Sequence, residues 1–199
     1  MLNSSTIQKK KQDHPNYGRD HGMTTKEWWQ DLICRVFVTA GYKGKLSTLR
    51  CVSNELWDRF EEGTDWEVIP HSHETLSALR NAGITLGVVS NFDEYLKKTL
   101  AVNKLDHYFD FLVTAVSAGT EKPDPAIFHH ALSMSGMSPS VSGHVGDDIS
   151  HDYHTPKSIG MSAFLFNRDS TLPKASLESI DQNDVISDLR DLSRLVVQH

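Results

Sequence analysis

The sequence predicts an α/β fold, a parallel sheet with helices on both faces, preceded by a helical segment. Two observations predict it. After Pro70, short apolar runs of strand length alternate with stretches of helical spacing, which is the pattern of a parallel, helix-covered sheet. The run over residues 84–89 is read as continuously apolar, as in a strand that is buried on both faces. Before Pro70, apolar residues recur only at helical spacing, so the chain is expected to change character there.

The segment before Pro70 is expected to hold two helices. Thr24 and Glu27 have the spacing of a capping box, and apolar residues then follow at helical spacing up to Gly41. The second helix is expected to end at Gly63 and carries apolar positions at Leu49, Val52, Leu56 and Phe60. The lysine-containing first dozen residues are expected to form a frayed polar terminus.

The segment after Pro70 is expected to alternate between strands and helices. Strands are predicted over residues 84–89, 109–116, 142–145 and 162–166. Helices are predicted over residues 72–82, 94–103, 125–136 and 149–159, with a last one that carries Leu189, Leu192 and Val196.

Composition excludes several classes of protein. The 199 residues carry 20 Lys+Arg and 26 Asp+Glu, and the pI is near 6.0, so we expect no nucleic-acid partner, because such partners need a basic face. No apolar run approaches the roughly 18 residues of a membrane span. Cys34 and Cys51 lack metal-type spacing and suit a reducing compartment. We therefore expect a cytoplasmic protein without a membrane partner.

Polar residues follow two of the predicted strands, where ligands bind in parallel sheets. Ser90 and Asn91 come directly after one strand and could offer a hydroxyl and an amide to phosphate or carboxylate oxygens; the alternative is a plain turn. Asp147 and Asp152 flank another strand-to-helix turn and could hold a hard cation. The alternative there is that Asp147 or its neighbour Asp148 only caps the helix.

Lys122 is the third candidate. It stands between a glycine loop and the run Pro123-Asp124-Pro125, in which Asp124 and Pro125 have the pattern of a helix start. The prolines restrict the backbone, as a site with a fixed lysine would require. The alternative is a surface lysine beside a helix start. A hydroxyl, a lysine and carboxylates at successive strand ends are the parts of a magnesium-dependent phosphoryl-transfer site.

These three groups resemble motifs of the haloacid dehalogenase-like (HAD) hydrolase superfamily. The turn at Ser90 resembles the second motif, Lys122 before Pro-Asp-Pro the third, and the run from Gly146 to Asp152 the fourth. Two further features resemble one group within this superfamily: the run His-Pro-Asn-Tyr-Gly from His14 and the tandem Trp28-Trp29. The resemblance covers about residues 14–170.

The resemblance implies a Rossmann-like core over residues 71–199 and a partial helical cap over residues 13–66. It implies a Mg²⁺-dependent phosphatase-type hydrolase of small phosphorylated molecules. In that scheme Lys122 is catalytic, Ser90 and Asn91 bind substrate, and Asp147 and Asp152 bind the metal.

The sequence departs from the family pattern at the nucleophile. The family's chemistry begins at an Asp-x-Asp motif after the first strand, and no Asp-x-Asp occurs in the 199 residues. We therefore expect the first strand to be missing, Mg²⁺ binding to be weak or absent, and phosphatase activity to be slight or nil. Without this strand, the strands that end at Val89 and Val145 are expected either to keep unpaired backbone between them or to pair with each other or with a partner. Two alternatives stay open: a non-catalytic binding or regulatory form with a protein partner at this open sheet, or a truncated isoform.

Overall fold

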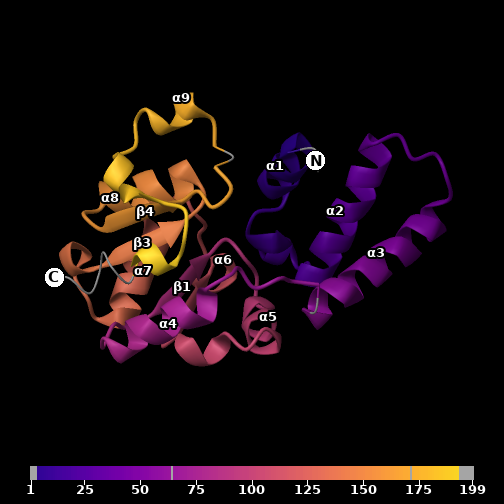
Figure 1. Ribbon diagram of the computed structural model, residues 1–199. Helices are drawn as coiled ribbons and strands as arrows, with labels where there is room; N and C mark the ends of the chain where they lie inside the picture. Colours follow the sequence, from indigo (N-terminus) through magenta and orange to yellow (C-terminus); the bar gives the residue numbers. More distant parts are fainter. Residues whose placement is uncertain (1–3, 64, 171, 193–199) are drawn as a thin grey trace. The chain divides into compact units, whose positions relative to one another are not determined.

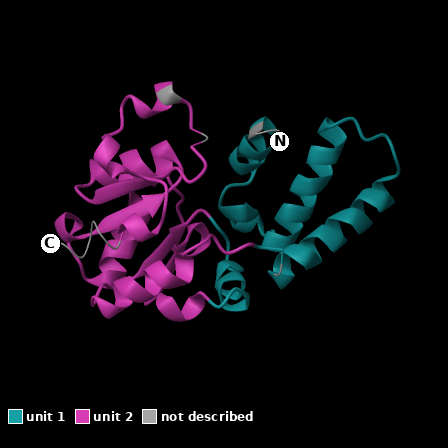
Figure 2. Cartoon of the chain, in the orientation of Figure 1, with its two compact units in different colours: residues 1–66, 92–104 teal, residues 67–91, 105–199 magenta. Residues whose placement is uncertain are grey.

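The computed structural model describes residues 4–63, 65–170 and 172–192, and the chain divides into two compact units (Figure 1, Figure 2). Unit 1 comprises residues 1–66 and 92–104, and unit 2 comprises residues 67–91 and 105–199. The sequence predicted one segment over residues 13–66 and another over residues 71–199, and the boundary between them lies near the boundary at residue 66 in the structure. It differs in the segment Phe92–Lys104, which the structure assigns to unit 1.

Unit 1 is helical. Its helices are α1 (Ser4–Asp13), α2 (Thr25–Thr39), α3 (Leu46–Glu62) and α5 (Leu96–Val102), with a short 3₁₀ segment, η1 (Asn16–His21). The capping box is confirmed: the Glu27 main-chain N–H donates to Thr24 Oγ1, and the Thr24 N–H donates to the Glu27 carboxylate. Gly63 ends α3 in the left-handed conformation. None of the described helices is both long and apolar enough to cross a membrane.

The expectation of a frayed amino terminus is wrong, because residues 4–13 form α1. Lys10 on this helix is 1% exposed, pairs with the carboxylate of Asp31, and lies 5.8 Å from the centre of the Trp28 ring. A buried lysine is stable only when it is paired, and the carboxylate and the aromatic face stabilise it. The sequence of α1 is polar and has no apolar stripe, so this contact could not be predicted from it.

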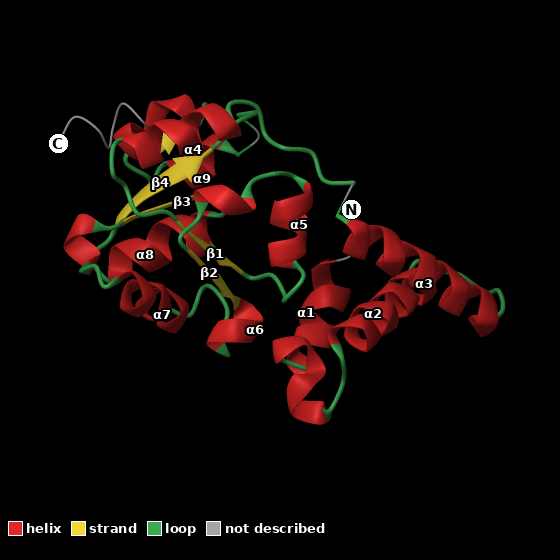
Figure 3. Ribbon diagram, turned by 90° about the horizontal axis from the view of Figure 1, so that it is seen from below, coloured by secondary structure: helices red, strands yellow, loops and turns green. Residues whose placement is uncertain are grey.

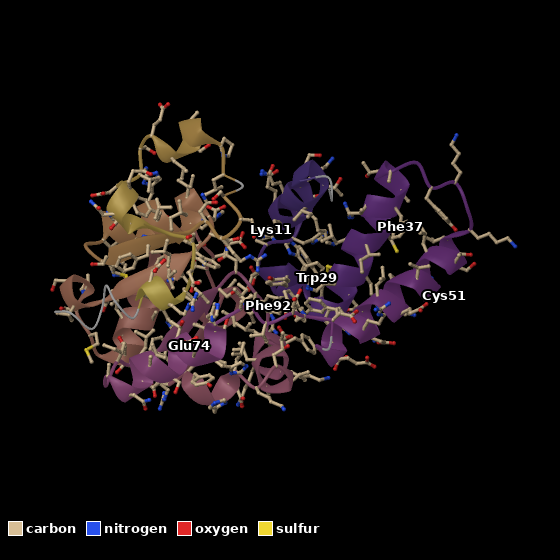
Figure 4. All side chains as sticks on the ribbon, viewed as in Figure 1. Lys11, Trp29, Phe37, Cys51, Glu74 and Phe92 are labelled. Carbon is tan, nitrogen blue, oxygen red and sulfur yellow. The ribbon has the colours of Figure 1, made fainter. Side chains whose placement is uncertain are left out.

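The segment Phe92–Lys104 belongs to unit 1 because its first residues join the aromatic core there. The Trp29 indole N–H donates to Asp93 Oδ2 at 2.8 Å, and the rings of Phe60 and Phe92 stack with centres 5.6 Å apart. Figure 4 labels Trp29 and Phe92. Asp93 itself is 1% exposed, so this hydrogen bond lies inside the core.

Unit 2 is an α/β unit with two small parallel sheets (Figure 3). The strands are β1 (Gly87–Ser90), β2 (Phe111–Thr114), β3 (Gly143–Gly146), β4 (Ser162–Phe166) and β5 (Val185–Ile186). The helices are α4 (Ser72–Asn81), α6 (Ala115–Ala118), α7 (Ala126–Ser135), α8 (Thr155–Ser158) and α9 (Lys174–Leu177). The predicted α/β class is confirmed.

The sheet of unit 2 is interrupted between β1 and β3. One sheet has the order β1-β2 and the other has the order β3-β4-β5, all pairs being parallel. No strand among the described residues joins β1 to β3. Of the outcomes that the sequence leaves open, direct pairing of β1 with β3 therefore does not occur among the described residues. Each sheet has its own core, one against α7 (Val113, Ile127, Phe128, Ala131) and one on β4 (Tyr153, Ala163, Leu165, Ile180).

Several predicted boundaries are corrected. The strand predicted over 109–116 ends at Thr114, because Thr114 and Ser117 form a capping box that starts α6. The helix predicted over 149–159 is a π-helical turn, η4 (Ile149–His154), followed by α8. Strand β5 was not predicted, since two residues show no periodicity. Val196 of the predicted last helix lies outside the described residues.

Candidate functional site

Lys122 connects the carboxyl ends of the two sheets. Its Nζ donates to the main-chain oxygen of Val89 in β1 at 3.1 Å and to Asp152 Oδ1 at 2.5 Å. The side chains of Lys122 and Asp152 are only 12% and 7% exposed. The ammonium group is therefore held in one place at the edge where parallel sheets bind ligands.

Asn91 fixes the main chain of Lys122. The Lys122 N–H donates to Asn91 Oδ1 at 2.6 Å, and Asn91 Nδ2 donates to the Lys122 carbonyl at 2.7 Å. The resemblance implied a substrate-binding amide here. In the structure both ends of the amide contact the loop that carries the lysine, so Asn91 positions Lys122.

Asp152 receives hydrogen bonds on both carboxylate oxygens. Lys122 Nζ and His144 Nε2 lie 2.5 Å and 3.0 Å from Oδ1, and the Asp148 N–H donates to Oδ2 at 3.1 Å. Burial alone would raise the pKa of Asp152, but the hydrogen bonds from His144 and Lys122 and the lysine's charge outweigh it and hold the pKa well below its usual range. The geometry thus gives Asp152 the role of counter-ion to Lys122.

His144 is the residue of this site to which the sequence analysis gave no role. Burial and the nearby charge of Lys122 lower its pKa, although Asp152 opposes them, so the ring is neutral at pH 7. A neutral ring with its proton on Nε2 donates to Asp152. The Phe128 ring packs edge-on against the His144 ring, with the two ring centres 4.9 Å apart, and orients the imidazole. The signal available in the sequence was a histidine inside a short predicted strand that precedes Gly146 and Asp147.

Gly146 lets the Asp152 carboxylate lie against the end of β3. A Cβ at this position would fall 2.3 Å from Asp152 Cγ, which is well inside contact distance. The π-helical turn η4 carries Asp152 back to this point, and the Asp148 carboxylate caps the turn by accepting the His151 N–H at 2.8 Å. The alternative reading as a helix cap therefore holds for Asp148.

The two predicted metal ligands, Asp147 and Asp152, both follow β3 but differ in burial, Asp152 being 5% exposed. Asp147 follows β3 and is exposed, and no hydrogen bond or ion pair of the described residues joins it to Lys122 or Asp152. No cluster of three or more His, Cys, Asp or Glu side chains that could hold a metal occurs among the described residues. Asp152 Oδ1 already accepts from Lys122 and His144 and Oδ2 accepts from the Asp148 N–H, so Asp147 is the less committed of the two carboxylates. These residues do not form a preformed magnesium site.

Comparisons with known proteins bear on the family of this chain. The family model described as haloacid dehalogenase-like hydrolase matches residues 22–166. The haloacid dehalogenase-like hydrolase domain-containing protein 3 of Bos taurus is 36% identical over 181 residues, which cover 91% of this chain and 72% of that protein. The rhythmically expressed gene 2 protein of Drosophila melanogaster is 33% identical, over 94% of this chain and 76% of that protein.

Solved structures show the same fold. A crystal structure of a dehalogenase superposes with a TM-score of 0.75 at 21% identity and covers 98% of this chain and 82% of that chain. A HAD phosphatase from Thermococcus onnurineus gives a TM-score of 0.65 at 23% identity, over 96% of this chain and 89% of that chain. The matched family model and the relatives together show that this chain belongs to the haloacid dehalogenase-like hydrolase family.

Proposed function

We propose that unit 2 binds the phosphate group of a small molecule at the carboxyl ends of its strands, through Lys122 and Ser90. The position of Lys122 Nζ between Val89 O and Asp152 Oδ1 carries the proposal. An ammonium group has three N–H donors, and two are directed at these oxygens, so the third can go to a ligand oxygen. Ser90 ends β1 next to the residue that accepts from Lys122.

The charges around Lys122 predict that a phosphate binds weakly on its own. Asp152 already balances Lys122, and Asp147 and Asp148 add negative charge after β3. A divalent cation that accompanies the phosphate offsets this repulsion, and Asp147 is the carboxylate placed to meet it. One solved HAD-hydrolase structure, YfnB from Bacillus subtilis, is described with magnesium bound; it is 16% identical and has a TM-score of 0.65. We propose weak Mg²⁺ binding that is coupled to phosphate.

Hydrolysis by this chain is proposed to be slight or nil. The 199 residues contain no Asp-x-Asp motif, and neither Asp147 nor Asp152 replaces a nucleophile held at the end of a strand between β1 and β3. Removing a nucleophile costs about 10⁴- to 10⁶-fold in rate. A second candidate function, a non-catalytic binding protein, is favoured by the edges of β1 and β3 that no strand of the described residues pairs.

The test is calorimetric titration of the protein with phenyl phosphate, with and without MgCl₂. We expect binding only with Mg²⁺ present, a loss of at least tenfold in affinity in Lys122→Met, and a smaller loss in Ser90→Ala. Lys157→Met is the matched control, because Lys157 is a lysine of the same unit that pairs with Asp184 outside the site. Equal affinity of the Lys122 and Lys157 variants would refute the proposal.

Turnover is measured separately with para-nitrophenyl phosphate. We expect the rate of the unmodified protein to equal that of Lys122→Met, at the background of the assay. A Mg²⁺-dependent rate that disappears in both Lys122→Met and Asp147→Asn would contradict the proposal of inactivity.

A further inference from the structure

Tyr153, the residue after Asp152, is 3% exposed, and its hydroxyl group makes contacts outside the candidate site. The hydroxyl donates to Asp184 Oδ2 at 2.7 Å and accepts from the Asp181 N–H at 3.2 Å and from Lys157 Nζ at 2.9 Å. A hydroxyl has one proton to donate and two lone pairs that accept, so these contacts use it fully. The Lys157 side chain is 39% exposed, so water can replace that contact. Asp184 is the partner that receives the hydroxyl proton.

The chain around Asp184 holds its carboxylate firmly. Asp184 ends the short 3₁₀ turn η5 (Gln182–Asp184) and directly precedes β5. Its N–H donates to the Asp181 carbonyl at 2.9 Å, and the Asp181 carboxylate accepts the Asn183 N–H at 2.9 Å. The next residue, Val185, pairs with Leu165 of β4. The acceptor of the Tyr153 proton is therefore attached to the sheet.

The Tyr153 ring is held by a different set of contacts. It packs with Ala163, Leu165 and Ile180 in the core on β4. A phenylalanine ring would fill the same space, so this packing does not require the hydroxyl group. A buried hydroxyl is stable only when it is hydrogen-bonded, and what its bonds add to the ring packing is a fixed direction.

Asp152 and Tyr153 are consecutive residues of the six-residue turn η4, and both are buried. The carboxylate of Asp152 contacts Lys122, whereas the hydroxyl of Tyr153 contacts Asp184. Two consecutive side chains that are fixed by different partners leave the turn little freedom to rotate. Turns of the π-helical kind are rare and frequently occur at functional sites.

The space for the Asp152 carboxylate is narrow. Its Cγ lies 2.3 Å from the point where a Cβ on Gly146 would stand, so the carboxylate is close against the main chain at the end of β3. A small rotation of η4 would move Oδ1 away from Lys122 and Oδ2 away from the Asp148 N–H. The contacts of the site thus depend on what holds the turn.

We propose that Asp184 is a positioning residue of the candidate site: through the Tyr153 hydroxyl it orients η4 and so holds the Asp152 carboxylate against Lys122. Asp184 follows Tyr153 by 31 residues and belongs to none of the motifs described above. The inference rests on the proposed function only for its effect on phosphate affinity, because the position of Asp152 can be measured without a ligand.

The first test is solvent exchange of main-chain amides, measured by NMR on the ligand-free protein. The Asp148 N–H donates to Asp152 Oδ2 and reports the position of that carboxylate, whereas the Ser162 N–H donates to Ser142 O and reports the pairing of β3 with β4. In Tyr153→Phe we expect at least tenfold faster exchange at Asp148 and less than twofold change at Ser162. Equal acceleration at both amides, or none at Asp148, would overturn the proposal.

Two changes at Asp184 test the route through the hydroxyl. Asp184→Asn keeps an oxygen that accepts from Tyr153, and we expect it to keep slow exchange at Asp148. Asp184→Leu removes the acceptor and is expected to behave as Tyr153→Phe does. Asp188→Leu is the matched control, because it removes a carboxylate of similar exposure that pairs with Arg190 instead. The proposal is wrong if the two leucine variants agree at Asp148, or if Asp184→Asn behaves as Asp184→Leu does.

Calorimetric titration with phenyl phosphate and MgCl₂ extends the test to binding. We expect Tyr153→Phe to lose at least threefold in affinity and Asp188→Leu to keep the affinity of the unmodified protein. If the unmodified protein binds no phenyl phosphate while the Asp148 amide responds as expected, the proposed function fails and Asp184 still positions the Lys122–Asp152 pair. Full affinity in Tyr153→Phe would overturn the role of Asp184 in binding.

Discussion

Asp152 Oδ1 lies 2.5 Å from Lys122 Nζ, and both side chains are nearly buried. A buried ion pair of this kind contributes less to stability than its short distance suggests, because both charges are desolvated. Removing one partner is costly, however, since the other charge then remains buried and unpaired. The pair therefore makes the candidate site and the stability of unit 2 depend on the same two residues.

The first prediction concerns this pair. Lys122→Met is expected to lower the free energy of unfolding at pH 7 by about 3 kcal/mol, because the Asp152 carboxylate loses its counter-ion. The double variant with Asp152→Asn is expected to recover part of the loss. Urea denaturation followed by far-UV circular dichroism measures both, whereas tryptophan fluorescence reports unit 1, which contains all four tryptophans. Strictly additive effects of the two changes would show that the residues are not coupled.

The second prediction concerns pH. The pKa of His144 is lowered by folding, so below about pH 6.5 the unfolded chain binds this proton more readily than the folded one. The contribution of His144 is fully present above that pH and is lost as the pH falls. We expect the free energy of unfolding to drop between pH 7 and pH 5, and His144→Gln, which keeps a neutral donor for Asp152, to reduce that drop by on the order of 1 kcal/mol. An unchanged pH dependence in the variant would contradict a buried neutral ring.

Asp152 is expected to cause a second loss of stability, at lower pH. Its pKa is depressed in the folded state, so its contribution is present above the ordinary aspartate value and is lost only as the pH falls below about 4. Asp152→Asn is expected to flatten the acid limb of the stability profile. The same profile, extended to pH 2, provides the measurement.

The third prediction uses two glycines of one strand. Gly146→Ala places a methyl group 2.3 Å from Asp152 Cγ, whereas Gly143→Ala meets nothing nearer than 3.8 Å. The first change is expected to destabilise the protein by about 2 kcal/mol and to weaken phosphate binding, and the second by less than about 0.5 kcal/mol. Thermal unfolding of the two variants, measured under the same conditions, tests this difference in stability. Similar losses would show that β3, rather than Asp152, is what the methyl group disturbs.

The fourth prediction concerns unit 1. Trp29 Nε1 donates to Asp93, whose pKa is raised chiefly by burial. Trp29→Phe removes this donor, and we expect a double-mutant cycle with Asp93→Asn to give a coupling of about 1.5 to 3 kcal/mol at pH 7. Denaturation in urea measures each corner of the cycle. A coupling near zero would mean that water replaces the indole.

The elements whose signals are local could be predicted from the sequence. The Thr24–Glu27 capping box and Gly63 mark helix ends through backbone chemistry that each residue type carries by itself, and the structure confirms both. The missing motif indicated that a strand between β1 and β3 is absent but left open whether these two strands pair directly, and the structure shows two sheets that are not joined.

The contacts of the site could not be predicted, because they depend on tertiary structure. Asn91 and Lys122 are 31 residues apart, and nothing in either motif says that the amide binds the lysine's own main chain. The commitment of Asp152 to Lys122 and His144 requires the π-helical turn, which a helical pattern does not distinguish from an α-helix. Lys10 was missed for a similar reason, since only the fold provides its partner.

Unit 1 is built from two stretches of chain, and residues 67–91 of unit 2, which include β1, lie between them. A ribosome delivers the chain in order, so the aromatic core of unit 1 lacks Phe92 and Asp93 until β1 has already been made. The two units cannot then mature one after the other, and neither can be obtained whole by a single cut in the gene. Folding of the two units is thereby linked in time, through the order of the sequence itself.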